Sequence, residues 1–133
     1  MSSKEILSLV IPVTKMAGRL NILRSWFENL DIEKLEIIFV HDISDQGTSN
    51  QLKEMIANSK FTNCQLIEGN FGSPGAARNR GLLECKGKWI SFWDSDDFVY
   101  VDAYLELLIN VDPDVDLLVG NYEVCDICRA RYS

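Results

Sequence analysis

The sequence predicts an α/β fold with a mostly parallel sheet that is covered by helices on both faces. Short, almost continuously apolar segments alternate along the chain with segments whose apolar residues recur at helical spacing. The apolar segments lack the polar alternation of a half-exposed strand, so both of their faces are expected to be buried. Such alternation of strands and helices is typical of a doubly covered parallel sheet.

Five apolar segments are expected to form strands, over residues 6–11, 35–40, 64–67, 88–93 and 116–120. Four helices are expected between them. Their apolar residues are Leu20, Leu23, Phe27 and Leu30, then Leu52, Met55 and Ile56, then Ala77, Gly81 and Cys85, and last Val101, Tyr104, Leu105 and Leu108. The pair Thr48 and Gln51 predicts a capping-box start for the second helix. Ser73 followed by Pro74 predicts the start of the third.

Composition narrows the class of protein. The 133 residues are expected to form one domain, over 1–133. The net charge of −7 argues against a nucleic-acid partner, because such partners require a basic face. No apolar run reaches the length of a membrane span, and the first residues lack the features of a signal peptide. A cytoplasmic location is therefore expected.

The four cysteines fit a reducing location. Cys64 and Cys85 lie in apolar patterns and are expected to be buried free thiols. Cys125 and Cys128 form a lone Cys-x-x-Cys, which could be half of a zinc site or a redox pair. No second pair is present and His41 is the only histidine, so two ordinary thiols are the favoured interpretation.

Ligands of parallel sheets bind at the carboxyl ends of the strands, which selects the loops at 12–18, 41–47, 69–75 and 94–98. The last loop carries Asp94, Asp96 and Asp97, three carboxylates within four positions. Carboxylates this close raise one another's pKa unless a cation lies among them, and oxygen ligands suit Mg²⁺ or Mn²⁺. The alternative is an acidic turn with no ligand.

The third helix adds an anion site to this edge. Ala77, Gly81 and Cys85 share one face, and their small size would let the helix pack close to the sheet. Arg78 lies off that face, in the first turns of the helix, where a helix N-terminus favours anions. The alternative is that Arg78 is a solvated surface charge.

Four segments together resemble the inverting glycosyltransferases of family 2, which have the GT-A fold. They are Val10-Ile11-Pro12, Phe39-Val40-His41-Asp42-Ile43-Ser44, Gly75-Ala76-Ala77-Arg78-Asn79-Arg80-Gly81 and Phe92-Trp93-Asp94-Ser95-Asp96-Asp97. The resemblance covers residues 7 to about 123, and its last two motifs in this order are the specific part. It implies a nucleotide-sugar donor, most often a UDP-sugar, and a divalent metal, Mn²⁺ or Mg²⁺.

The resemblance also implies roles for individual residues. Asp96 would be the metal ligand, and Asp94 with Ser95 would lie near the ribose and diphosphate. Asp42 would contact the uracil, and Arg78 would face the nucleotide. The loop of Pro12, Val13 and Thr14 would border the base.

Two departures from the family pattern border the expected base pocket. The family usually has two adjacent aspartates where this chain has His41-Asp42, and an aromatic residue with asparagine where it has Thr14-Lys15. The catalytic base and the acceptor-binding part are expected beyond residue 133, so the chain resembles a donor-binding half that is either a natural short form or a truncation. The remaining carboxylates do not make a credible base: Asp97, Asp112, Asp114 and Asp116.

The sequence therefore predicts a metal-dependent transferase that moves a sugar from a nucleotide-sugar to an acceptor whose class (saccharide, lipid or protein) is open. The main alternative is a non-catalytic nucleotide-binding or interaction module derived from such a transferase, and self-association into a homo-oligomer is a further expectation. A phosphatase of the haloacid-dehalogenase type is weaker, because its Asp-x-Asp normally belongs to the first strand, whereas here the motif closes the fourth. A dinucleotide-binding domain is weaker still, because the glycines follow the third strand.

Overall fold

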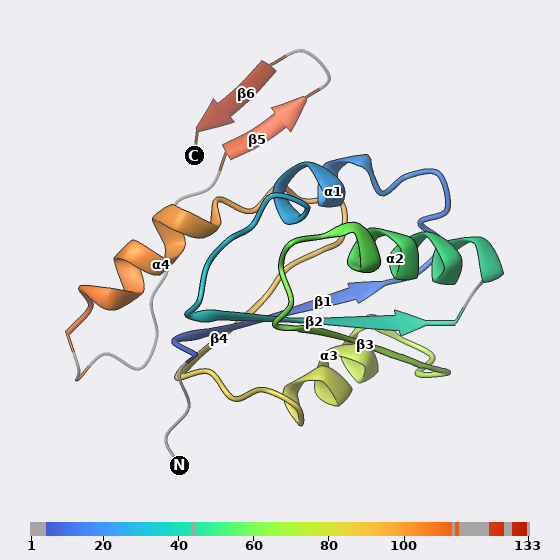
Figure 1. Ribbon diagram of the computed structural model, residues 1–133, viewed down its shortest axis with the longest axis horizontal. Coiled ribbons are helices and arrows are strands. Elements are labelled where there is room, and N and C mark those ends of the chain that lie inside the picture. Colours follow the sequence, from blue (N-terminus) through green and yellow to red (C-terminus); the bar gives the residue numbers. More distant parts are fainter. Residues whose placement is uncertain (1–4, 44, 113, 115–122, 127–128, 133) are drawn as a thin grey trace.

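The computed structural model describes residues 5–43, 45–112, 114, 123–126 and 129–132. Four strands form one parallel sheet in the order β3-β2-β1-β4 (Figure 1). The strands are β1 (Leu7–Val13), β2 (Leu35–Asp42), β3 (Cys64–Gly69) and β4 (Trp89–Phe92). The predicted α/β fold with a parallel sheet is thereby confirmed, and the expected strand at 116–120 lies outside the described residues.

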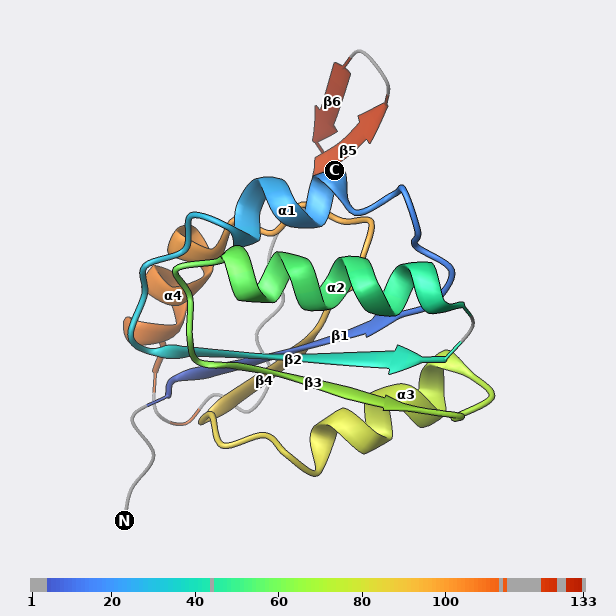
Figure 2. The same ribbon diagram turned by 45° about the vertical axis from the view of Figure 1, so that its right-hand side comes forward.

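Helices cover both faces of this sheet, as the sequence predicts. The helices α1 (Asn21–Phe27) and α2 (Gln46–Asn58) lie on one face, and α3 (Pro74–Leu82) lies on the other (Figure 2). The last helix, α4 (Val101–Ile109), packs into the same hydrophobic cluster as α1 and α2. Within the described residues, no helix combines the length and the apolar character needed to cross a membrane.

A separate two-stranded antiparallel sheet is formed by β5 (Glu123–Asp126) and β6 (Arg129–Tyr132). The sequence interpretation does not anticipate this hairpin. It contains Cys125, whereas Cys128 lies outside the described residues. The expected pair of ordinary thiols therefore stays a prediction.

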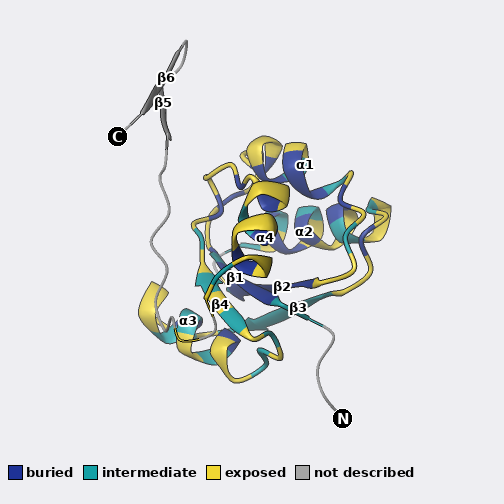
Figure 3. Cartoon of the chain, turned by 90° about the vertical axis from the view of Figure 1, so that its left-hand side faces the viewer, coloured by how far each residue is buried: buried dark blue, intermediate teal, exposed yellow. Residues whose placement is uncertain are grey.

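The alternation of side chains along the strands divides the core into two clusters. Leu9, Ile37 and Phe39 are fully buried on the face of α1 and α2, and Val10 and Val40 are fully buried on the face of α3. Figure 3 shows the corresponding layer of buried residues in the strands and on the inner surfaces of the helices. Burial on both faces explains why β1 and β2 are almost continuously apolar in sequence. The same expectation is wrong for β4, where Ile90 and Phe92 are exposed on one face.

The helix α3 lies close to the sheet because its contact face is small. A Cβ atom on Gly81 would lie 2.5 Å from Cγ1 of Val10 and 3.0 Å from Cγ2 of Val40. Ala77 on the same face is 1% exposed. Cys85 is half-buried rather than buried, as is Cys64, and burial raises the pKa of both thiols.

The start of α2 differs from the predicted one. The N-cap is Asp45, whose carboxylate accepts a hydrogen bond from the backbone N–H of Thr48 at 2.8 Å. The hydroxyl of Thr48 instead accepts a hydrogen bond from the backbone N–H of Met16, 2.9 Å away. Thr48 is therefore a buried link between α2 and the loop after β1, and the capping-box prediction is wrong.

A buried carboxylate, Glu36, forms hydrogen bonds near the amino ends of the strands. Glu36 is 4% exposed, and its Oε2 accepts hydrogen bonds from Ser8 Oγ, at 2.6 Å, and from the backbone N–H of Lys86. Ser8 Oγ in turn accepts from the backbone N–H of Gly87 at 2.8 Å. These bonds hold the connection between α3 and β4, and so fix where β4 begins.

Candidate functional site

The carboxyl ends of the four parallel strands meet at one edge of the sheet. The strands end there at Val13, Asp42, Gly69 and Phe92. The expected ligand loops at 12–18, 41–47, 69–75 and 94–98 therefore all leave the sheet at this edge. Ser44, in the second of these loops, lies outside the described residues.

The loop after β4 is a tight turn with a fixed backbone. Its ends are joined by a hydrogen bond from the Asp97 N–H to the Asp94 carbonyl at 3.1 Å. Trp26 on α1 donates its indole N–H to the Asp97 carbonyl at 3.2 Å, and Ser95 is buried within the turn. The hydrogen bond from Trp26 thus ties the turn to α1, and the sequence did not reveal this contact.

The three carboxylates of this turn remain exposed and lie close together. Oxygen atoms of Asp94, Asp96 and Asp97 all lie within 4.8 Å of one another. Partial burial raises the pKa of the Asp97 carboxyl, and the charges of Asp96 and Asp94 raise it further. A divalent cation would relieve this repulsion, and carboxylate oxygens are ligands that Mg²⁺ and Mn²⁺ accept. The residues therefore fit a divalent metal.

Arg78 lies beside this cluster, in the middle of α3. Ser73 caps the helix by accepting a hydrogen bond from the Ala76 N–H at 3.1 Å, and Pro74 occupies the first turn. Arg78 Nη2 lies 3.5 Å from Asp94 Oδ1. Both side chains are exposed, so this is a loose surface ion pair that a ligand can rearrange. The structure thus brings together two residues that the sequence places sixteen positions apart.

Asp42 ends β2 and orders the loop that leads to α3. Its Oδ1 accepts a hydrogen bond from the Phe71 N–H at 3.0 Å, and its Oδ2 accepts one from the Gly72 N–H at 3.2 Å. Gly72 has a φ of +83°, a conformation that glycine adopts without strain. Asp42 is therefore at the expected edge, and its carboxylate already has two backbone partners. The predicted contact with uracil stays a prediction.

The first loop offers fewer side chains than the sequence interpretation assumes. Thr14 is exposed and Pro12 is half-buried, so both can contact a ligand at this edge. Val13 is 2% exposed and belongs to the hydrophobic core, so only its backbone is available. Ser95 is 8% exposed, so its side chain also offers little surface to a ligand.

The sequence did not reveal a polar cluster around the buried His41, the residue next to Asp42. His41 is fully buried, and its Nδ1 lies 2.8 Å from Oε2 of Glu68 on β3. On α2, Ser49 donates to the same oxygen at 2.6 Å, and Lys53 Nζ lies 3.3 Å from Glu68 Oε1. The Ser49 and His41 hydrogen bonds lower the pKa of Glu68 to about 2. The spacing of Ser49 and Lys53, one helical turn apart, is the signal that could have indicated this cluster.

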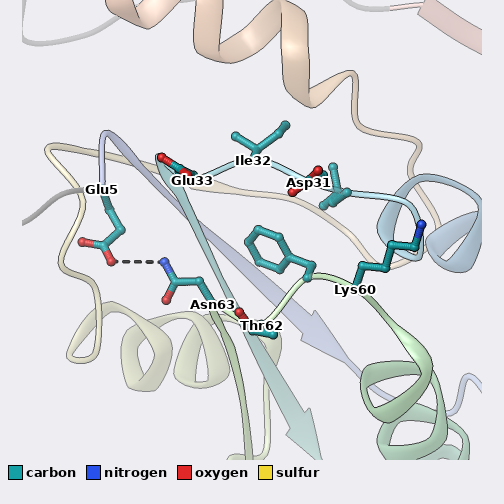
Figure 4. Close-up of a pocket in the computed structure, with 9 residues that line it drawn as sticks. Glu5, Asp31, Ile32, Glu33, Lys60, Thr62 and Asn63 are labelled. Atoms are coloured by element: carbon teal, nitrogen blue, oxygen red, sulfur yellow. Dashed lines mark hydrogen bonds between the residues drawn. The ribbon is translucent and has the colours of Figure 1, made fainter.

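A pocket of about 380 Å³ lies at the other edge of the sheet (Figure 4). Its lining comes from the segments that precede β1, β2 and β3, including Glu5, Asp31 and Phe61. Within it, Asn63 Nδ2 donates to Glu5 Oε1 at 3.1 Å. Because it adjoins the amino ends of the strands, this pocket is separate from the carboxylate turn.

Two of the relatives found by comparison with known proteins are described as glycosyltransferases. An uncharacterized glycosyltransferase of Haemophilus influenzae is 32% identical over 124 residues, which are 92% of this chain and 49% of that protein. A poly(ribitol-phosphate) beta-glucosyltransferase of Bacillus spizizenii is 34% identical over 103 residues, 74% of this chain and 16% of that protein. The chain therefore spans about half the length of the first relative and less of the second.

Solved structures show the same fold. The crystal structure of Staphylococcus aureus TarS 1-349 in complex with UDP matches 77% of this chain and 32% of its own with a TM-score of 0.60, at 22% sequence identity. The family model described as glycosyl transferase family 2 matches residues 8–133. This span includes the parallel sheet, the carboxylate turn and Arg78. The chain belongs to glycosyl transferase family 2.

Proposed function

We propose that this chain is the donor-binding part of a metal-dependent glycosyltransferase that uses a nucleotide-sugar, and that the nucleotide is UDP. The observation that carries the proposal is the exposed carboxylate turn next to Arg78, at the carboxyl edge of a family 2 sheet. Family membership supports the reaction class. TarS, which shares this fold, is a protein crystallised with UDP and with UDP-GlcNAc.

The roles of the residues follow from their charges. Asp96 and Asp97 would hold a divalent cation, which in such enzymes neutralises a leaving diphosphate as a Lewis acid. Arg78 would exchange Asp94 for a phosphate oxygen, because their contact is long and exposed. The helix α3 would add the partial positive charge of its N-terminus. The carboxylates alone would repel a diphosphate, so binding should require the metal.

The loop residues would orient the base. Asp42 holds the backbone of Phe71 and Gly72, so its carboxylate is fixed at the end of β2 before a ligand arrives. A fixed carboxylate can accept the imide N–H of uracil. Pro12 and Thr14 would border the same base from the neighbouring strand β1.

Calorimetry with UDP tests the proposal. We expect UDP to bind in the presence of Mn²⁺ and not in the presence of EDTA, and Asp96→Asn to lose the metal-dependent part of binding. Asp31→Asn is the matched control, because Asp31 is an exposed carboxylate near the amino ends of the strands. Equal UDP affinity with and without the metal would contradict the proposed site.

A further inference from the structure

Two exposed aromatic rings follow the carboxylate turn directly. Phe98 is 44% exposed and Tyr100 is 59% exposed. Their ring centroids lie 4.9 Å apart with an interplanar angle of 57°, so the rings contact each other in a tilted arrangement, here named the aromatic pair. Aromatic side chains usually bury most of their area, and exposed clusters of them commonly mark binding surfaces.

The backbone holds the aromatic pair in place from both sides. Val99 between the two rings is 2% exposed, and Val101 after them is 4% exposed, so alternate side chains are anchored in the core. The Asp97 carbonyl before them accepts the hydrogen bond of Trp26. Because Val99 and Val101 point into the core, the two rings point outward. The backbone is already ordered, so a ligand that covers the rings loses little free energy to ordering it.

We propose that the aromatic pair is a subsite for a pyranose ring, an inference that rests on the proposed function. A pyranose has an apolar face of C–H groups and a rim of hydroxyls. The rings of Phe98 and Tyr100 offer area for the C–H face. The carboxylate turn lies directly before the pair in the chain, and those of its oxygens that the metal does not take can accept hydrogen bonds from the hydroxyls.

Aromatic rings with carboxylates beside them also attract organic cations, which are the alternative ligand. The neighbouring charges favour the sugar. Arg78 already places a guanidinium within 3.5 Å of Asp94, and the turn is expected to take a metal ion as well. A neutral sugar ring adds no further positive charge to a turn that already has Arg78 and the expected metal ion, whereas an organic cation would.

The sugar could belong to the donor or to the acceptor, and the two sources give different results. For a donor sugar, the double variant Phe98→Ala/Tyr100→Ala should bind UDP normally with Mn²⁺ but bind UDP-GlcNAc about two- to tenfold more weakly. For an acceptor sugar, saturation-transfer NMR with methyl β-D-glucopyranoside should lose its signal in the same variant. Either result supports the subsite.

Three further arms make the test decisive. Phe92→Ala is the matched control, because Phe92 on β4 is also 44% exposed, and it should change neither measurement. Phe98→Leu/Tyr100→Leu keeps apolar volume without ring faces and should behave like the alanine variant, which guards against a folding defect. Choline is the cationic probe.

The subsite would be overturned if both sugar measurements stayed at the wild-type level in the double variant, or if choline binding alone were lost. Loss of self-association alone would assign the pair to a protein interface and would also overturn it. If the wild-type chain bound no UDP, the proposed function would fail. The glucoside measurement without nucleotide would still report on the aromatic pair, so the two failures are distinguishable.

Discussion

At the scale of residues, the charged groups of this chain depend on a few specific hydrogen bonds. Glu68 is the clearest case, because its carboxylate accepts from Ser49 and contacts His41 and Lys53. Those contacts stabilise the ionised form and lower the pKa of Glu68 from 4.5 to about 2. The cluster ties β2, β3 and α2 together just behind Asp42.

Glu68→Gln should therefore destabilise the fold in a pH-dependent way. At neutral pH we expect a loss of about 1–3 kcal/mol in the free energy of unfolding, because the amide leaves donors poorly paired. A carboxyl whose pKa is lowered by folding contributes its full stability above the unfolded pKa of 4.5 and loses it as the pH falls toward 2. The difference between variant and wild type should thus shrink below about pH 5.

Urea unfolding across this pH range measures the effect. Glu54→Gln is the control, because Glu54 is an exposed carboxylate on the same helix α2. A Glu68→Gln penalty that is the same in acid as at neutral pH would show that the Glu68 charge is not what the cluster stabilises.

At the scale of elements, the position of α3 depends on a single missing side chain. Gly81→Ala would place a Cβ within 2.5 Å of Val10 in the centre of the sheet. We expect it to destabilise the fold by about 1–3 kcal/mol through overpacking, despite the better helix propensity of alanine. It should also weaken UDP binding, because α3 positions Arg78.

Gly75 provides the matched comparison within the same helix. A Cβ on Gly75 meets no atom within 4 Å. Gly75→Ala should therefore be neutral or slightly stabilising in the same thermal or urea measurement. Equal effects of the two substitutions would contradict the close packing of α3 on Val10.

The elements also show what the sequence can predict. The strands β1 and β2 were predictable because burial on both faces leaves almost continuous apolar runs, as in residues 35–40 of β2, which only Glu36 interrupts. The start of α2 was not, because Asp45 and Thr48 are both good capping residues and a distant contact with Met16 decides between them. The carboxylate cluster was predictable from adjacent residues. Its anchor Trp26 and Glu68, the partner of the buried His41, come from other elements, and sequence spacing does not reveal such contacts.

At the scale of the whole molecule, β4 is the last strand on one side of the described sheet, and it has an exposed apolar surface. Ile90 and Phe92 pair in register with Ser8 and Val10, so they lie on the face of α3. They remain 41% and 44% exposed, because α3 packs on Val10 and Val40 instead. Exposed edge strands with apolar side chains pair readily with other chains.

Ile90→Lys should therefore reduce self-association of this chain. Sedimentation velocity over a range of protein concentrations measures it, with Ile22→Lys as the control, because Ile22 on α1 is 40% exposed. We expect the first substitution to shift the chain toward the monomer and the second to leave association unchanged. A wild-type chain that is monomeric at all concentrations would contradict this prediction.

The proposed metal and nucleotide meet at the carboxyl edge of the sheet. Paramagnetic broadening by Mn²⁺ in amide NMR spectra, recorded with UDP present, tests this claim most directly. We predict that the signals of residues 94–97 broaden first, and that those of Arg78 and Asp42 follow. Signals near Asp31 and Lys60, beside the pocket at the amino ends of the strands, should stay sharp. Broadening centred on that pocket, or broadening spread evenly over the acidic surface, would contradict the account.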